Sequence, residues 1–204
     1  MRILVACEFS GVVRDAFLAR GHRAVSCDLL PTESPGPHIL GDVLEVLGDG
    51  WDMLIAHPPC THLCVTGNRW MKPEHKSRFP NREQERKEAI TFFLKLYNAP
   101  VLRVAVENPV GIMSTVFRKP DQYIHPYYFG ERHSKKTGLW LRGLKKLEPT
   151  EMVEPEWYTH KSGARSPSWH RETLDLPHRE RGKVRSKTFQ GVAEAMAEQW
   201  GGEA

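Results

Sequence analysis

Two short motifs in this sequence carry the side chains best suited to covalent chemistry. Cys60 ends the motif His57-Pro58-Pro59-Cys60, and Glu107 begins the motif Glu107-Asn108-Pro109. A cysteine thiolate is a strong protein nucleophile. A carboxyl group that burial keeps protonated can donate its proton to a ring nitrogen. The pair therefore predicts covalent attack on an electron-poor ring, with Cys60 as the nucleophile and Glu107 as the acid.

The segments that precede the two motifs predict elements that would place them side by side. The short apolar runs 52–56 and 102–106 are typical of buried strands. In an open α/β sheet, ligands bind at the carboxyl ends of the strands. The two prolines of the first motif fix the backbone just after its strand and present the cysteine. We therefore expect Cys60 and Glu107 at the same edge of one sheet.

An earlier part of the chain contains a turn that could bind a cofactor. Phe9-Ser10-Gly11 lies between a predicted strand, 2–7, and a predicted helix, 11–20, for which Ser10 is the expected N-cap. The free N–H groups and the dipole at a helix N-terminus bind polar ligand groups. We therefore expect this turn to contact a ligand.

Two carboxylates follow at the ends of the next predicted elements. Asp28 ends a strand predicted at 23–27, where nucleotide-binding sheets place a carboxylate for ribose hydroxyls. Asp42 could accept a hydrogen bond from an adenine amino group. Either carboxylate alone is also compatible with a turn or a cap. Together with the first turn, at successive strand ends, they indicate an adenosine-type cofactor.

The residues around Cys60 and Glu107 also allow other interpretations. Cys60 could be a buried structural thiol, and Glu107 could form a salt bridge with an arginine. His57, Cys60, His62 and Cys64 could ligate zinc. However, the cysteines of this stretch have no second pair in the sequence, and three residues separate them where the Pro-Cys-x-x-Cys motif of zinc-dependent base deaminases has two. We therefore expect no metal.

The composition indicates a globular protein of one domain. The chain has 204 residues, of which 40% are apolar, enough for a hydrophobic core. Its 4 cysteines show no disulfide framework, which fits a reducing compartment. No apolar run approaches the ~18 residues of a membrane span, and the first residues lack the long apolar region of a signal peptide. We therefore expect a cytoplasmic protein.

The order of predicted elements indicates an α/β fold. A helix is predicted at 82–97, a closing pair of strands at 123–129 and 139–142, and an amphipathic C-terminal helix at 188–200. Strands and helices alternate through most of the chain. This alternation predicts a doubly wound, mostly parallel sheet with helices on both faces.

Positive charge concentrates in the second half of the chain. The net charge is +4, whereas residues 131–187 alone contain 14 Lys/Arg and 8 Asp/Glu. This basic region could face phosphates, or it could be an ordinary solvated surface. We expect a catalytic core at 1–142, a basic substrate-contact segment with little periodicity at 143–187, and a C-terminal segment at 188–204 that packs back on the core.

Taken together, the motifs resemble those of the DNA cytosine-5 methyltransferase family, most closely its compact forms encoded by bacteriophages and prophages. The resemblance covers most of the chain and implies a Rossmann-like fold that binds S-adenosylmethionine. It rests on these residues: Phe9-Ser10-Gly11, Asp28, Gly41-Asp42-Val43, Pro58-Pro59-Cys60, Glu107-Asn108-Pro109, Tyr128-Phe129-Gly130 with Arg132, Lys135, Lys136 and Leu139-Trp140-Leu141, and Gly191 to Trp200.

The resemblance implies a role for each candidate residue. Cys60 would attack carbon 6 of a cytosine in DNA, Glu107 would stabilise the protonated ring nitrogen 3, and carbon 5 would take a methyl group. Pro59 and Asn108 belong to the same two catalytic motifs. The residues expected to contact S-adenosylmethionine are Phe9, Ser10, Gly11, Asp28, Asp42 and Pro58. The residues expected to hold the cytosine carbonyl or DNA phosphates are Arg132, Lys135 and Lys136. A phage-encoded protein of this kind would act in the bacterial host cell.

The chain departs from the family pattern in the region that would select the target. The large target-recognition region of the family is reduced here to about 143–187. Sequence-specific readout needs several base-edge contacts from a shaped surface. We therefore expect low specificity, or help from a second copy, a helper protein or a base that is already exposed. Trp157 and Trp169 could stack on a DNA strand, or they could fill a small core.

Two other functions stay open on the sequence alone. The small recognition region is compatible with methylation of free or single-stranded cytosine nucleotides. The first loop has Val12-Val13 where the family usually has more glycine, and the basic strand has no Gln-x-Arg-x-Arg pattern. These departures would also fit a non-catalytic DNA-binding relative that has lost turnover.

Overall fold

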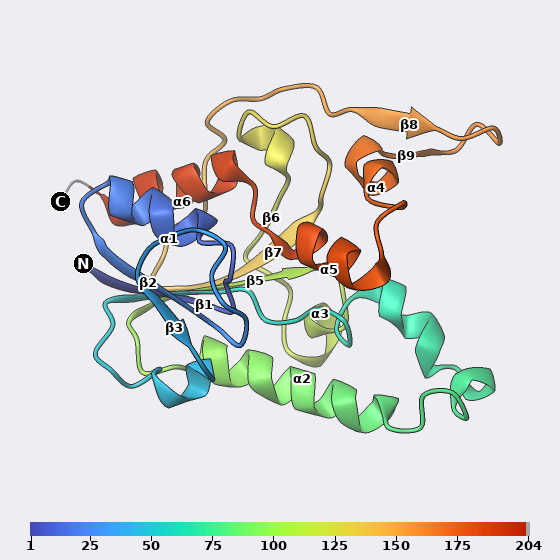
Figure 1. The fold of residues 1–204 in the computed structure, drawn as a ribbon, viewed down its shortest axis with the longest axis horizontal. Helices are drawn as coiled ribbons and strands as arrows, with labels where there is room; N and C mark the ends of the chain where they lie inside the picture. Colours follow the sequence, from blue (N-terminus) through green and yellow to red (C-terminus); the bar gives the residue numbers. More distant parts are fainter. Residues whose placement is uncertain (203–204) are drawn as a thin grey trace.

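Seven strands form one mostly parallel sheet in the computed structural model, which describes residues 1–202 except for the side chains of His178 and Arg179. The strand order is β3-β2-β1-β4-β5-β7-β6, and β7 runs antiparallel to both of its neighbours (Figure 1). The predicted doubly wound α/β fold is confirmed. The strands are β1 (Arg2–Ala6), β2 (Arg23–Asp28), β3 (His38–Leu40), β4 (Met53–Ala56), β5 (Arg103–Pro109), β6 (Gln122–Ile124) and β7 (Thr137–Arg142).

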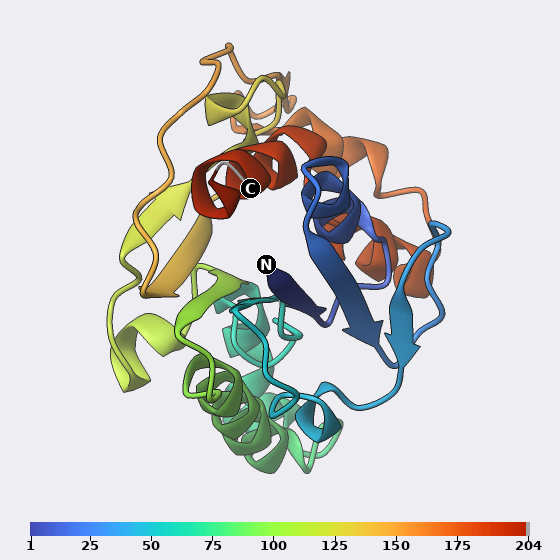
Figure 2. The same ribbon diagram turned by 90° about the vertical axis from the view of Figure 1, so that its left-hand side faces the viewer.

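Helices cover both faces of this sheet. Two of them lie side by side on one face and a third covers the other (Figure 2). The pair is α1 (Val12–Ala19) and α6 (Gln190–Gly201), and the third is α2 (Arg82–Tyr97). Short helical segments elsewhere are α3 (Met113–Val116) and 3-10 helices at Val43–Glu45, Val65–Met71, Pro73–His75 and Pro126–Tyr128. None of the helices in the described residues is long and apolar enough to cross a membrane.

The central strands are buried on both sides, which explains their continuous apolar runs. Side chains alternate between the two faces of a strand. In β1, Ile3 and Val5 pack in the cluster under α1 and α6, whereas Leu4 and Ala6 pack in the cluster under α2. The strand ends that emerge from this core are consequently held at fixed positions.

Close backbone contact fixes the C-terminal helix on the core. A Cβ atom at Gly191 would collide with the carbonyl of Phe129, and the Gly191 N–H donates to Oε1 of Glu131 at 2.6 Å. At the other end of α6, the Trp200 indole donates to the carbonyl of Lys145 at 2.9 Å. The predicted C-terminal helix is therefore present, and it packs beside α1.

The start of α1 differs from the prediction. Gly11, not Ser10, occupies the N-cap position, with a positive φ of 79°. The carboxylate of Glu8 instead accepts hydrogen bonds from the N–H groups of Val13 at 2.7 Å and Arg14 at 3.2 Å. The prediction of Ser10 as N-cap is wrong, because the longer side chain of Glu8 reaches the same amides.

Several strand boundaries differ as well. β1 ends at Ala6, because Cys7 adopts a left-handed conformation with a φ of 58°. The sequence analysis does not predict β3, because this strand has only 3 residues. The strand predicted at 123–129 is reduced to β6, since a 3-10 helix begins at Pro126.

Residues 143–187, here named the appendage, contain more regular structure than their sequence predicts. They form a two-stranded hairpin followed by two helices, and Figure 1 shows the hairpin extending away from the sheet. All residues of the first hairpin strand are exposed. The elements are β8 (Trp157–Thr159), β9 (Arg165–Pro167), α4 (Ser168–Glu172) and α5 (His178–Ser186).

Candidate active site

The carboxyl ends of the parallel strands form the edge where a ligand would bind. The chain runs outward from β1 to β2 and β3 and then returns to β4, so the direction of winding reverses between β1 and β4. Such a switch point creates a crevice at the carboxyl ends of the two strands. Every candidate catalytic and cofactor-binding residue lies at the end of a strand from β1 to β5 or in the loop that follows it.

A hydrogen bond across the sheet edge joins the two catalytic motifs. Nδ2 of Asn108 donates to the carbonyl of Pro58 at 2.9 Å, and Asn108 is only 1% exposed. The structure therefore brings Cys60 and Glu107 to one edge of one sheet, as the sequence predicts. Asn108 bridges their motifs rather than facing solvent.

The loops that follow the two motifs are also paired. The N–H of Val65 donates to the carbonyl of Val110 at 3.1 Å, and the N–H of Ile112 donates to the carbonyl of Leu63 at 2.8 Å. Gly111 lies between these bonds, where a Cβ atom would collide with the Leu63 carbonyl. The position therefore requires glycine, and backbone hydrogen bonds hold the two loops together.

Helix α2 holds the Cys60 loop from another side. Arg82 donates to the carbonyl of Thr61 at 3.1 Å, and Arg86 donates to the carbonyl of His62 at 2.9 Å. These bonds satisfy carbonyls that the turn leaves without backbone partners. Neither arginine stands out in the sequence, because the start of α2 is a charged helix of ordinary composition.

A buried histidine holds the carboxyl group of Glu107. Nδ1 of His57 lies 3.0 Å from Oε2 of Glu107, and the two side chains are 7% and 14% exposed. Burial raises the pKa of Glu107, but the hydrogen bond from His57 and the positive charges of Lys135 and His57 outweigh it. The pKa of Glu107 therefore lies below its ordinary value. The expectation that desolvation keeps Glu107 protonated is wrong for the free protein, because it omits His57.

Cys60 and Cys64 form a thiol pair in the loop after β4. The N–H of Cys64 donates to the carbonyl of Cys60 at 2.9 Å and closes a turn between them. The hydrogen bond from Cys60, with others from Thr66 and the Gly67 N–H, overcomes burial and lowers the pKa of Cys64 to about 5. The same contact, burial and the Glu107 charge raise the pKa of Cys60 far above its usual range.

This thiol pair changes the expected state of the nucleophile. The two thiols titrate as a coupled pair, in which the pKa of Cys64 is lowered and the pKa of Cys60 is raised. The sequence suggests Cys64 only as a zinc ligand. The spacing of Cys60 and Cys64 in the sequence could have indicated that the two thiols interact. A turn that closes between residues four apart brings their side chains together.

Carboxylates gather where β1, β2 and β3 end. Asp28 accepts a hydrogen bond from the N–H of Leu30 at 2.9 Å, and Asp42 accepts one from the N–H of Leu44 at 2.9 Å. Both thus serve as turn or cap residues, the alternative that the sequence leaves open. Burial raises the pKa of the Cys7 thiol, and the charges of Asp28 and Asp42 raise it further. The three strand ends therefore converge on one acidic region.

The first loop is tightly packed. Phe9 and Ser10 are each 8% exposed, and Oγ of Ser10 lies 3.5 Å from Oε1 of Glu8. A Cβ atom at Gly11 would meet the Arg14 guanidinium at 2.5 Å. Because Glu8 already occupies amides of α1, those amides are closed to a ligand. Glu8 is thus a residue of this region that the sequence prediction missed.

Helix α5 of the appendage reaches both sides of the crevice. Nζ of Lys183 lies 5.9 Å from the centre of the Phe9 ring. On the catalytic side, Lys135 donates to the carbonyl of Arg185, the residue before the last of α5, at 3.1 Å. The appendage therefore contacts the expected cofactor loop and the surroundings of Glu107 at the same time.

Of the predicted substrate-binding residues, Lys135 lies beside the carboxyl group of Glu107, since its charge lowers the pKa of that group and both residues line one pocket. Arg132 forms an ion pair with Glu156 at 3.4 Å. Nζ of Lys136 lies 4.5 Å from the centre of a tyrosine ring. Arg132 and Lys136 are thus engaged with other partners in this structure.

The two tryptophans of the appendage have different surroundings. Trp169 donates from its indole to the carbonyl of Ser134 at 3.0 Å and packs edge-on against Phe189. Trp157 is 39% exposed, and the guanidinium of Arg165 lies 5.2 Å over its ring. Trp169 therefore belongs to a small core, whereas Trp157 has a surface available for stacking.

A small pocket opens beside Glu107. Its polar lining includes Glu107 and Lys135, and its apolar lining comprises Ile124, Pro126, Phe189, Val192 and Met196. Its volume of about 20 Å³ has room for roughly one water molecule. A planar base could enter only if the surrounding side chains or α5 move.

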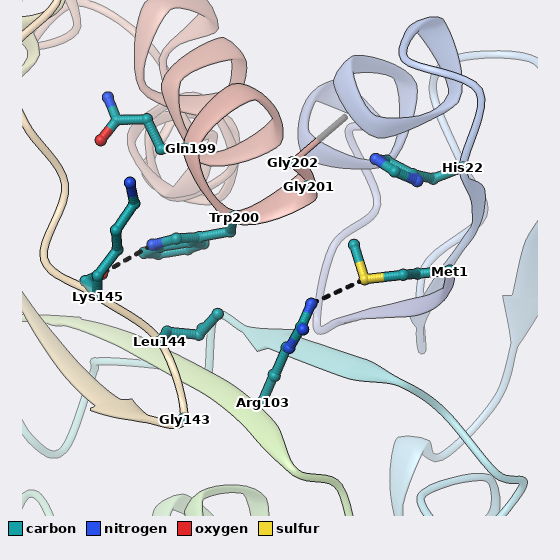
Figure 3. A pocket seen from close by; sticks show the side chains of 10 residues that line it. All are labelled: Met1, His22, Arg103, Gly143, Leu144, Lys145, Gln199, Trp200, Gly201 and Gly202. Carbon is teal, nitrogen blue, oxygen red and sulfur yellow. Dashed lines mark hydrogen bonds between the residues drawn. The ribbon is translucent and has the colours of Figure 1, made fainter. Parts of the chain in front are cut away.

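A larger hollow lies at the opposite edge of the sheet. Figure 3 shows this pocket of about 500 Å³ between the end of α6 and the start of β5, with His22, Arg103 and Trp200 in its wall. None of the predicted site residues lines it. The candidate site is therefore located by its chemistry rather than by the size of a cavity.

Among the side chains that the structure describes, no three His, Cys, Asp or Glu residues come together as a metal site requires. His57 is bound to Glu107, and Nδ1 of His62 faces Oε2 of Glu85 at 3.6 Å. The four residues proposed as zinc ligands thus do not form a zinc site in this structure.

No family model matches this chain, and no curated protein matches it. Among solved structures, the chain is similar to an E. coli protein encoded within a prophage and described as a candidate DNA modification methyltransferase. The two chains are 12% identical with a TM-score of 0.47, and the match covers 91% of this chain and 69% of that one. At this level of similarity, the function has to be inferred from the residues of the site.

Proposed function

We propose that this protein transfers a methyl group from S-adenosylmethionine to carbon 5 of cytosine in DNA, with Cys60 as a covalent nucleophile. The observation that carries the proposal is the placement of Cys60 and Glu107 on two loops joined by hydrogen bonds at one sheet edge. A thiol and a carboxyl group so arranged can act on one pyrimidine ring. The thiol adds to carbon 6, and the carboxyl group stabilises the charge that develops at ring nitrogen 3.

The acidic crevice at the ends of β1 to β3 suits this methyl donor. Asp28 and Asp42 can accept hydrogen bonds from ribose hydroxyls and an adenine amino group. Carboxylates disfavour a phosphate-bearing cofactor and favour a cationic ligand. S-adenosylmethionine has a sulfonium and an ammonium group and no phosphate, and when bound it supplies the methyl group. The residues that would hold it are Phe9, Ser10, Gly11, Asp28, Asp42 and Pro58.

The side chains of this protein would form and break the covalent bond to the base. The Cys60 sulfur bonds to carbon 6, and the electrons of the 5,6 double bond shift through carbon 4 as ring nitrogen 3 takes a proton from Glu107. Carbon 5 then becomes nucleophilic and accepts the methyl group. Removal of the carbon-5 proton by a base breaks the bond to Cys60. The 5,6 double bond reforms, and ring nitrogen 3 returns its proton.

Cys60 has to lose its proton before it attacks. The neighbouring thiol is Cys64, which interacts with Cys60 closely enough to shift the pKa of both groups. Because the pKa of Cys64 is lowered, its thiolate is a weak base and does not readily take this proton. The proton of Cys60 therefore passes to solvent when the thiolate forms.

The exposed appendage supports DNA as the substrate. Trp157 and Tyr158 of the hairpin are each 39% exposed, with Arg165 over the first ring and Arg171 over the second. Aromatic rings stack on bases, and arginines bind the phosphate backbone. In duplex DNA the target cytosine would leave the base stack, at a cost of a few kcal/mol.

Mass spectrometry of nucleosides tests this proposal directly. Plasmid DNA is isolated from cells that express the protein or the Cys60→Ala variant, and 5-methylcytosine is quantified. We expect the modified base with the wild type only. Reactions with duplex DNA, single-stranded DNA and free cytosine nucleotides then identify the substrate form. If the folded wild type modifies none of these substrates, the proposal is wrong.

A further inference from the structure

His57 connects the catalytic carboxyl group to the core of the sheet. Its Nδ1 lies at hydrogen-bonding distance, 3.0 Å, from Oε2 of Glu107. Its backbone N–H donates to the carbonyl of Ala6 at 2.9 Å, which extends the pairing of β4 with β1 and fixes the position of the residue. The imidazole is therefore held against Glu107 by the sheet itself rather than by a mobile loop.

The second ring nitrogen of His57 is unused by the protein. Nε2 is buried and has no hydrogen-bond partner among the side chains and backbone groups that the structure describes. Buried polar atoms are nearly always paired, so an unpaired one needs an explanation. One ring nitrogen thus contacts Glu107, whereas the other is free to carry or lose a proton.

Other titratable groups face this pair from three neighbouring segments. Glu8, from the loop after β1, interacts with His57. Lys135, from the segment before β7, and Cys60, from the loop after β4, interact with Glu107. Glu8, whose pKa is raised by burial, therefore lies on the histidine side of the pair, and the positive charge of Lys135 lies on the carboxylate side.

We propose that His57 is a positioning residue that keeps Glu107 ionised until cytosine enters, and then supplies the proton that Glu107 passes to ring nitrogen 3. This inference rests on the proposed function. The free protein holds Glu107 as a carboxylate, so Glu107 alone has no proton to give when Cys60 attacks. His57 is the adjacent group that can store that proton.

The proton count balances over one cycle. The relay requires a proton on each ring nitrogen of His57 while Glu107 is ionised. When cytosine is bound, the Nδ1 proton moves to Glu107 and a proton moves from Glu107 to ring nitrogen 3, which leaves His57 neutral with its proton on Nε2. When Cys60 leaves carbon 6, ring nitrogen 3 returns the proton by the same route.

The pH dependence of methyl transfer distinguishes this relay from a purely structural contact. His57→Asn keeps an N–H donor near Glu107 but has no proton to transfer. We expect this variant to be roughly 100-fold slower than wild type at pH 8. It should regain most of that loss as the pH falls, because Glu107 then takes its proton from solvent. His22→Asn, at the opposite edge of the sheet, is the matched control and should keep the wild-type profile.

A second readout does not depend on activity. The imidazole nitrogens of the free protein are followed by NMR as a function of pH, in the wild type and in Glu107→Gln. We expect the titration of the His57 signals to change in the variant, while that of the His22 signals stays the same. An unchanged His57 titration would contradict the pairing and would overturn the proposal.

The outcomes separate this inference from the proposed function. If the wild type is active and His57→Asn reduces the rate equally at every pH, the relay is wrong and the proposed function stands. If the wild type transfers no methyl group to any cytosine substrate, the proposed function fails and the relay fails with it. A loss confined to neutral and alkaline pH supports both.

Discussion

The carboxyl edge of the sheet and the hairpin of the appendage are built in different ways. At the sheet edge, His57, Cys60 and Glu107 lie on segments that bond to neighbouring strands and to each other. In the hairpin, every residue of β8 is at least partly exposed, and β8 pairs with the three residues of β9. The first region is fixed by the core, whereas the second is supported mainly by its own pairing and by α4.

This difference in support indicates different roles for the two regions, with catalysis at the sheet edge and DNA binding in the hairpin. Reacting groups need to be held close to their productive geometry, because small misplacements cost large factors in rate. Attraction between cations and a phosphate backbone tolerates looser geometry, because it acts over longer distances. We therefore expect changes at the sheet edge to reduce the rate of transfer and changes in the hairpin to weaken DNA binding.

Apart from loss of the nucleophile Cys60, the largest effect is expected at Glu107. In Glu107→Gln the side chain keeps its size but has no proton to pass to the base, so the rate of methyl transfer should fall by about 100-fold or more. Single-turnover kinetics measures this rate, and calorimetry should show unchanged binding of S-adenosylmethionine. Glu74→Gln, an exposed carboxylate on a 3-10 turn, is the control. A rate within threefold of wild type would remove Glu107 from the mechanism.

Two glycine substitutions test whether the loops after β4 and β5 are held together by their hydrogen bonds. Gly111→Ala forces a Cβ atom into the carbonyl of Leu63, whereas a Cβ atom at Gly48 meets nothing within 4 Å. We expect Gly111→Ala to lower the free energy of unfolding by about 1–3 kcal/mol, as overpacking does, and to slow transfer. Gly48→Ala should leave both unchanged in urea denaturation and activity assays. Equal behaviour of the two variants would contradict the pairing of the loops.

A smaller effect is expected from charges at the tip of the hairpin. Lys161→Ala combined with Arg165→Ala should weaken DNA binding several-fold and lower the salt dependence of binding by about 1 for each phosphate group that the variant no longer neutralises. Lys95→Ala, on the exposed side of α2, is the control. Fluorescence anisotropy at several salt concentrations measures both quantities. An unchanged salt dependence would exclude the hairpin tip from the DNA-binding surface.

The smallest effect is expected for the stability of a variant in the hairpin, compared with a variant in the core. Trp157→Ala removes an exposed ring and should change the free energy of unfolding by less than about 0.5 kcal/mol. Phe93→Ala removes a fully buried ring under α2 and should cost about 3–5 kcal/mol. Urea denaturation of both variants makes the comparison. A large loss of stability in Trp157→Ala would mean that the hairpin is part of the core.

Much of the fold can be predicted because it depends on local sequence. The apolar runs of β1, β4 and β5 indicate buried strands, and the polar residues that end them lie at the same sheet edge because the strands are parallel. The helix at 82–97 and the C-terminal helix also follow from local patterns. The short strand β3 and the appendage elements do not, because they have only three to nine residues and little apolar periodicity.

The electrostatics of the site could not be predicted in the same way. The position of Glu107 follows from its strand, but its ionised state depends on His57, which lies 50 residues away in the sequence. The acidity of Cys64 depends on a turn that closes onto Cys60. Such properties arise only when side chains from different segments meet, so a single sequence does not reveal them.

The most direct test of the central claim is whether Cys60 forms a covalent bond to cytosine. The protein is incubated with S-adenosylmethionine and DNA that contains 5-fluorocytosine, in which the carbon-5 proton needed for release is replaced by fluorine. Peptide mass spectrometry then locates the stable adduct. We predict an adduct at Cys60 that is absent from Cys60→Ser and present in Cys64→Ser. An adduct at Cys64, or no adduct in a folded protein that binds the DNA, would contradict the account.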